Sequence, residues 1–253
     1  MNSTVTAAPV VNAPKRAMGE NYLLLLRAIH MHLRPKSYLE IGSETGISLA
    51  LSACASVAVD PAFQIKRDVI QKKPCFHAYQ MPSDDFFRRV DPTVVLGDKI
   101  DFAFLDGMHL YEFLLRDFIN TEKYCRRNSL IALHDCVPSD VPMTRRAQNG
   151  PEKELSSQPS WWTGDVWKVV PILKNYRPDL AIVVADAEPT GLVLITNFDP
   201  TSKVLEERYS EIIREMADVD LAAYGLDRFV KECELVPTAG LLTFESLTKR
   251  FWL

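Results

Sequence analysis

The chain has 253 residues, of which 47% are hydrophobic and 25% are charged. This length suits one α/β domain with extensions, and the composition excludes a globally disordered chain. The net charge of −4 gives no sign of a nucleic-acid-binding surface, and the five scattered cysteines form no C-x-x-C pair. We therefore expect a reduced, cytoplasmic protein that binds neither nucleic acid nor a membrane.

The first sixteen residues are rich in Ala, Val, Thr, Asn and Pro and lack the features of a signal peptide, so residues 1–16 predict a flexible tail. Short apolar strands then alternate with helices, which is typical of a doubly wound, mostly parallel sheet. The expected strands cover residues 37–41, 56–59 and 75–79, and two more end at Asp106 and His134. The expected helices cover residues 17–33, 47–55, a polar stretch after Asp60, 86–90, 111–125, 165–176 and 203–219.

Two further strands, 180–185 and 192–197, are joined through Pro189 and Gly191 and predict a hairpin at the edge of the sheet. Residues 137–163 are rich in Pro, Ser, Gln and Gly and have no clear period. Such a stretch is commonly a lid or binding loop. We expect one domain over residues 17–200 that includes this lid, with residues 201–253 as a helical extension packed on it. The apolar end of the chain could dock on the body or on a second subunit of a homodimer.

A glycine-bearing turn, Glu40-x-Gly42-x-x-x-Gly46, follows the first strand. Its spacing differs from the G-x-G-x-x-G dinucleotide fingerprint, and it lacks the Gly-Lys-Ser/Thr ending of a P-loop. A carboxylate at the strand tip would repel pyrophosphate and suits a cationic ligand group instead. Asp60 ends the next strand, where nucleotide-binding sheets carry the acid that holds ribose hydroxyls.

Polar side chains also end the fourth and fifth strands, in Asp106-Gly-x-His109 and in His134-Asp135. The carboxyl ends of parallel strands meet in one crevice, so we expect these groups to converge. Asp106, His134 and Asp135 form a reasonable ligand set for Mg²⁺, Mn²⁺ or a borderline metal. Equally, His134 and Asp135 could bond each other and cap the next turn. Histidine titrates near neutral pH, so His109 is our candidate general base.

The glycine turn together with Asp60 resembles the first two motifs of class I S-adenosylmethionine-dependent methyltransferases, with Glu44 in place of a common middle glycine. The resemblance covers residues 37–197 and implies a Rossmann-like methyltransferase sheet. It places Gly42 and Gly46 beside the amino-acid end of the cofactor, Asp60 at the ribose, and Ser83 and Asp84 at the adenine. The cofactor-binding residues that it implies are Glu40, Gly42, Ser43, Gly46, Asp60, Ser83, Asp84 and Asp106.

The second half of the pattern is similar to the metal-dependent O-methyltransferase branch, and to a bacterial subgroup with DGxH and HD strand ends. In that branch an Asp after strand four and a polar pair after strand five hold a divalent cation. The resemblance implies O-methylation of a hydroxyl on a small molecule or sugar, with Mg²⁺ or Mn²⁺ at Asp106, His134 and Asp135. Asp106 and His109 would be catalytic, and the expected contacts to the acceptor are Trp162, Asp165 and Trp167.

Two alternatives remain open at this point. A metal-independent methyltransferase of the same fold would use His109 and His134 together for the acid–base work. A non-catalytic nucleotide-binding scaffold would keep the sheet alone, although four polar groups at one crevice favour an enzyme. The sequence leaves the identity of the acceptor and the oligomeric state undecided.

Overall fold

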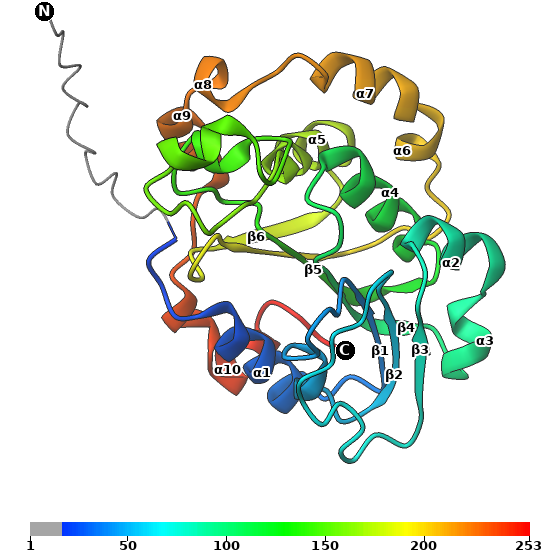
Figure 1. Cartoon of the computed structure of the whole chain (residues 1–253). Helices are drawn as coiled ribbons and strands as arrows, with labels where there is room; N and C mark the ends of the chain where they lie inside the picture. The colour runs from blue at the N-terminus through cyan, green and yellow to red at the C-terminus, as the bar shows by residue number, and fades with distance from the viewer. Residues whose placement is uncertain (1–16) are drawn as a thin grey trace, which may run out of the picture.

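The computed structural model describes residues 17–253, and the predicted tail of residues 1–16 lies outside them. Its centre is a seven-stranded sheet in the order β3-β2-β1-β4-β5-β7-β6 (Figure 1). The strands are β1 Ser37–Ile41, β2 Ala55–Val59, β3 Phe76–Tyr79, β4 Ile100–Leu105, β5 Cys125–His134, β6 Ala181–Ala185 and β7 Leu192–Thr196. The first five are mutually parallel, and β7 runs antiparallel to β5 and β6. The doubly wound, mostly parallel sheet with a hairpin is thus confirmed.

Helices cover both faces of the sheet, which explains why its central strands are buried throughout. They are α1 Tyr22–Leu33, α2 Ser83–Arg89, α3 Pro92–Leu96, α4 Tyr111–Glu122, α5 Val169–Tyr176, α6 Val204–Glu207, α7 Tyr209–Met216, α8 Leu221–Tyr224, α9 Leu226–Cys233 and α10 Phe244–Thr248. Helices α1 and α10 lie side by side on one face, while α4 and α5 belong to the other (Figure 1). Within the described chain, no helix has the length and apolar character needed to cross a bilayer.

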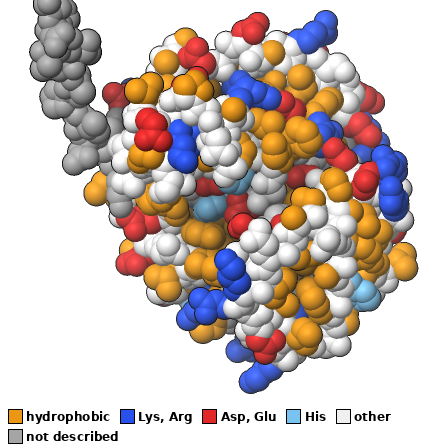
Figure 2. Space-filling model, in the orientation of Figure 1, with side chains coloured by type: hydrophobic (Ala, Val, Ile, Leu, Met, Phe, Trp, Pro, Cys, Tyr) orange, Lys and Arg blue, Asp and Glu red, His pale blue; other side chains and the backbone are white. Residues whose placement is uncertain are grey.

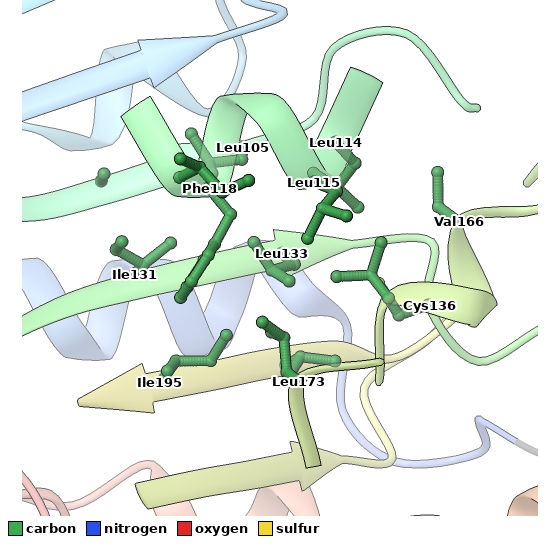
Figure 3. Packing of buried hydrophobic residues seen from close by; sticks show 14 of the residues in the cluster. Leu105, Leu114, Leu115, Phe118, Ile131, Leu133, Cys136, Val166, Leu173 and Ile195 are labelled. Carbon is green, nitrogen blue, oxygen red and sulfur yellow. The ribbon is translucent and has the colours of Figure 1, made fainter. Parts of the chain in front are cut away.

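In helix α4, the residues with helical hydrophobic periodicity are those that pack against the sheet. Leu114, Leu115 and Phe118 recur at helical spacing and are almost fully buried, as predicted. They pack onto the sheet beside Leu105 and Ile131 (Figure 3). Burying each such side chain contributes about 1.5–3 kcal/mol to stability. This packing fixes the start of α4 next to the carboxyl end of β4, where the candidate site lies.

Several predicted helices were wrong in extent or type. Residues 47–55 contain only a 3-10 turn at Leu49–Leu51, because too few residues separate the glycine turn from β2 for a full crossover helix. The polar stretch after Asp60 is not helical, since the amides of Gln64 and Lys66 donate to the carbonyls of residues 44 and 45. Helix α5 begins at Val169 rather than at residue 165.

The boundaries of three other helical segments also differ from the sequence prediction. Helix α2 begins at Ser83, inside the expected loop, and the expected helix 203–219 is divided into α6 and α7 at Arg208. Helix α3 was not predicted, although Asp91 caps it and Pro92 occupies its first turn. That pairing of an N-cap Asp with Pro at the first helical position was a usable signal.

One carboxyl group in α4 has unusual surroundings for a charge. Asp117 is 2% exposed, and its Oδ1 atom has no hydrogen-bond partner within the described structure. Burial raises the pKa of Asp117 to about 7, although a hydrogen bond from Ser83 lowers it. In the unfolded chain the same group titrates at a pKa of about 3.9. Rising pH therefore favours the unfolded chain, which releases this proton first.

The variant Asp117→Asn has no proton to lose at this position. We expect its stability relative to the wild type to increase by on the order of 2 kcal/mol between about pH 5 and about pH 8. Urea unfolding of both proteins at the two pH values measures this difference. An equal difference at both values would show that Asp117 titrates normally in the folded protein.

Candidate active site at the carboxyl ends of the strands

The glycine turn after β1 lies directly against the end of β4. Gly42 and Gly46 have φ angles of 85° and 76°, a region that favours glycine. A Cβ atom at Gly42 would lie 1.9 Å from the carbonyl oxygen of Asp106. The glycine turn, predicted to hold a cofactor, is therefore in direct contact with the end of β4, predicted to carry reacting groups. A side chain at residue 42 would disrupt this contact.

Glu40 lies beneath this turn instead of opening toward a ligand. It is fully buried and accepts hydrogen bonds from the Tyr38 hydroxyl at 2.5 Å and the Ser48 hydroxyl at 3.0 Å. Burial raises its pKa to about 7, even though these hydroxyl groups lower it. Residues 38 and 40 share one face of β1 by strand alternation. The carboxyl group of Glu40 thus supports the turn through protein hydroxyls.

Ser43 and Asp60 offer polar atoms at the same turn. Ser43 is buried, and a hydrogen bond from its hydroxyl to Glu40 helps to lower the pKa of that carboxyl group. Asp60 ends β2 and accepts the backbone amides of Glu44 at 2.8 Å and Ala62 at 2.7 Å. A carboxylate oxygen can accept more than one hydrogen bond, so Asp60 retains capacity for ligand hydroxyls. A buried hydroxyl, a carboxylate and a glycine turn fit an amino-acid–ribose ligand.

Ser83 and Asp84, predicted to contact a base, form the first turn of α2. Asp84 accepts two hydrogen bonds from Arg116, at 2.9 Å and 2.7 Å. Ser83 is hydrogen-bonded to Asp117 of α4. Both side chains therefore tie α2 to α4. They stand near the carboxyl ends of β3 and β4, but their polar atoms already have protein partners.

Four side chains from the ends of β4 and β5 form one cluster. His134 Nδ1 lies 3.2 Å from Asp106 Oδ1 and 3.4 Å from Asp135 Oδ1. His109 Nε2 lies 3.1 Å from Asp135 Oδ2 and 3.4 Å from Asp106 Oδ1. Figure 2 shows a hollow in the middle of one face of the molecule, where histidine and acidic side chains gather. The convergence expected from the strand ends is present.

The charges of the cluster shift one another's protonation. Burial alone would lower the pKa of His109, but Asp135 and Asp106 outweigh it and raise that pKa to about 9. The same two carboxylates raise the pKa of the buried His134 well above its usual value. Burial would raise the pKa of Asp135, yet His134 and His109 hold it below its ordinary range. At neutral pH the imidazole of His109 is therefore protonated on both nitrogens and positively charged.

Three of these residues also form a plausible ligand set for a cation. One donor atom each from Asp106, His134 and Asp135 lies within 4.8 Å of the others. Two carboxylates and one imidazole suit Mn²⁺ and borderline metals, and Mg²⁺ to a lesser extent because it prefers oxygen. The repulsion between two carboxylates held this close is reduced when they share a cation. The residues present therefore fit a divalent cation.

The end of the irregular 137–163 loop, with Gly164 just after it, lies directly on His109. His109 Nδ1 is 2.7 Å from the carbonyl oxygen of Trp162, and the two rings are 5.0 Å apart. A Cβ atom at Gly164 would lie 1.6 Å from the carbonyl oxygen of His109. A carbonyl only accepts, so Nδ1 donates to it and Nε2 points at the carboxylates. Trp162 thus lies at the site, where the sequence placed it.

Asp165 and Trp167, also expected to contact an acceptor, are interior residues. Asp165 is 3% exposed, accepts the backbone amide of Tyr111 at 3.1 Å and pairs with Lys168 at 3.1 Å. It caps the start of α4, a position that favours a carboxylate. Trp167 is 1% exposed and packs against Tyr224 and Phe229. The structure uses these two side chains to hold the loop and the helices together.

Two residues at the cluster were missed by the sequence reasoning. The ring of Tyr22, at the start of α1, lies 4.1 Å from the ring of His134. The hydroxyl of Thr190, from the connection before β7, donates a hydrogen bond to Asp135. Each reaches the site through a pairing distant in sequence. A tyrosine after the N-cap Asn21, or a threonine in a turn, carries no local signal for such a role.

Part of the sequence matches a known protein family. Residues 39–136 match the model of a methyltransferase domain family. This match indicates a methyltransferase domain over that part of the chain. The matched methyltransferase domain runs from β1 through the glycine turn and Asp60 to the His134-Asp135 pair. The 137–163 loop, the hairpin and the C-terminal helices lie outside the match.

Solved structures of similar proteins were also found. An O-methyltransferase, TomG from Streptomyces achromogenes with bound S-adenosylmethionine, is 13% identical, with 78% of this chain and 92% of that chain covered and a TM-score of 0.48. An O-methyltransferase from Bacillus cereus in complex with S-adenosylhomocysteine is 12% identical, with 76% and 83% covered and a TM-score of 0.46. No curated protein matches the sequence.

Proposed function

We propose that this protein transfers the methyl group of S-adenosylmethionine to a hydroxyl oxygen of a small molecule or sugar, with a divalent cation at Asp106, His134 and Asp135. The main support is the contact between Gly42 and the Asp106 backbone, because the glycine turn then lies beside the cluster of Asp106, His109, His134 and Asp135. Such a junction is what methyl transfer requires, since the sulfonium methyl and the acceptor oxygen must meet in line.

In this proposal the cofactor extends along the carboxyl ends of β1 and β2. Its amino-acid end would lie at Gly42, Ser43 and Gly46, where both glycines have positive φ angles. Its ribose hydroxyls would bind Asp60. The adenine would lie near Ser83 at the start of α2. Glu40 would contribute indirectly, because its buried carboxyl group supports the glycine turn from beneath. This arrangement follows the general rule that ligands of open α/β sheets bind at the carboxyl ends of the strands.

His109 would accept the proton of the acceptor hydroxyl. The Trp162 carbonyl holds Nδ1–H, so that the basic lone pair of the neutral ring is on Nε2, which faces the crevice. The C–S bond to the sulfonium breaks as the O–CH₃ bond forms, S-adenosylhomocysteine leaves, and the hydroxyl proton passes to Nε2. A divalent cation at this cluster would acidify a hydroxyl and offset the carboxylate charge that now keeps His109 protonated.

Calorimetric titration with S-adenosylhomocysteine tests the cofactor assignment. We expect micromolar binding by the wild type and a loss of at least about 100-fold for Asp60→Ala, because charge-assisted hydrogen bonds to two ribose hydroxyls contribute about 1.5–3 kcal/mol each. Asp68→Ala, in the exposed segment after the turn, serves as the matched control. Absence of binding by the wild type would refute the methyltransferase proposal.

The role of the cation is tested separately with labelled S-adenosylmethionine and a panel of catechols and sugars. We expect transfer in the presence of Mn²⁺ or Mg²⁺ and its loss with EDTA. Full transfer in EDTA would instead favour the metal-independent alternative, in which His109 and His134 share the proton chemistry. Cofactor binding with no transfer to any hydroxyl would contradict O-methylation.

A further inference from the structure

The imidazole of His134 packs against two aromatic rings. The Tyr22 ring lies 4.1 Å away at an interplanar angle of 39°, and the Phe104 ring lies 5.9 Å away at 62°. His134 itself is 7% exposed. These two aromatic neighbours, whose ring centroids lie 6.2 Å apart, leave the imidazole little room to rotate. Its orientation is therefore set by packing as well as by its hydrogen bonds.

This orientation leaves one nitrogen of the ring without a partner. His134 Nδ1 faces Asp106 and Asp135, whereas Nε2 is buried and has no hydrogen-bond partner among the described residues. Leaving a buried polar nitrogen unpaired costs about 1–3 kcal/mol. Packing must therefore prevent the ring from turning toward another arrangement. The Tyr22 ring is the nearer of the two aromatic neighbours and makes the closer contact with the imidazole.

Tyr22 reaches this place through a short stretch of backbone pairing. Its amide donates to the carbonyl of Glu188 at 2.9 Å, and the amide of Glu188 donates to the carbonyl of Glu20 at 3.1 Å. Two residues after Glu188, the Thr190 hydroxyl donates to Asp135. The segment 186–190 thus anchors both the aromatic cover of His134 and the carboxylate of Asp135. The N-terminal end of α1 is part of the site through this segment.

We propose that Tyr22 is a positioning residue of the cation site, whose ring fixes His134 with Nδ1 directed at the space between Asp106 and Asp135. The inference rests on the cation site of the proposed function. Partners that orient a metal-binding imidazole usually affect metal affinity by about 10- to 100-fold. Here the orienting group is an aromatic ring from helix α1 and not a hydrogen-bond acceptor, because Nε2 has no acceptor among the described residues.

The test compares the affinities of the purified full chain for Co²⁺ and Mg²⁺. Co²⁺ gains from an imidazole ligand, whereas Mg²⁺ depends on the carboxylate oxygens. We expect Tyr22→Leu to weaken Co²⁺ binding by about 10- to 100-fold and Mg²⁺ binding by much less, so that the ratio of the two dissociation constants changes. Tyr22→Phe keeps the ring and should remain within about 3-fold of the wild type for both ions.

Leu24→Ala, on the exposed side of the same helix, is the matched control and should leave both affinities unchanged. The visible absorption of bound Co²⁺ gives a second readout, because loss of the nitrogen ligand alters it. If Tyr22→Leu does not fold, Tyr22→Met carries the same comparison with an unbranched apolar side chain. Equal weakening of Co²⁺ and Mg²⁺ by the variant without a ring would refute the positioning role. Failure of the wild type to bind either ion would refute the cation site itself.

Discussion

Replacing His109 by glutamine is expected to lower kcat for methyl transfer by about 100- to 10,000-fold, the usual contribution of a general base. Glutamine retains hydrogen-bonding capacity but cannot accept a proton at neutral pH. Cofactor affinity should remain near that of the wild type, because the His109 ring contacts Trp162, Asp106 and Asp135 and not the glycine turn. Steady-state kinetics with labelled S-adenosylmethionine, together with calorimetry, separates the two quantities.

His77 offers a matched control, since it is an exposed histidine on β3 away from the cluster. His77→Gln should leave both kcat and cofactor affinity unchanged. A His109→Gln variant with near-normal kcat would remove the base assignment. His109 would then only orient Asp135.

The second large effect is expected at Gly42. An alanine there would have to adopt a φ angle of 85° and place its Cβ atom 1.9 Å from the carbonyl oxygen of Asp106. Because the obstacle is backbone and not a flexible side chain, the turn or the end of β4 must move. We expect a loss of about 3 kcal/mol or more in the free energy of unfolding. We also expect S-adenosylhomocysteine binding to fall beyond detection.

A control at Gly97 separates the strain of a positive φ angle from the clash with the Asp106 carbonyl. Gly97 also has a positive φ angle, 74°, but a Cβ atom there would meet nothing within 4 Å. Gly97→Ala should therefore cost only the conformational term, about 1 kcal/mol, and keep full cofactor binding. Chemical denaturation and calorimetry of the two variants give the comparison. Equal losses of stability would mean that the contact with Asp106 has no special importance.

Sequence periodicity was sufficient to predict the sheet and the convergence of the cluster. The strands that carry Glu40, Asp106 and His134 are apolar runs with polar ends, and parallel strands bring such ends together. The apolar stripe of α4 was read correctly for the same reason. In these cases the information lies within a few neighbouring residues.

The errors arose where distant contacts decide the structure. The polar stretch after Asp60 was expected to be helical, yet the amides of Gln64 and Lys66 donate to carbonyls of the glycine turn. The sequence also did not reveal that Asp165 accepts the amide of Tyr111 at the start of α4, because the chain returns to that helix after a long loop. Tyr22 contacts His134 across more than a hundred residues, through backbone pairing with the segment before β7. Local patterns contain none of these contacts.

Because of the hydrogen bond between His109 and Trp162, residues 39–136 alone do not contain all the groups that orient the proposed base. The imidazole belongs to the segment that matches a methyltransferase domain, while the carbonyl that orients it comes from outside that match. A chimera that carried residues 39–136 into another sheet would receive the acids and imidazoles but not the acceptor for Nδ1–H. Its His109 would be free to choose either tautomer. Any graft of this chemistry would therefore have to include the chain as far as Gly164.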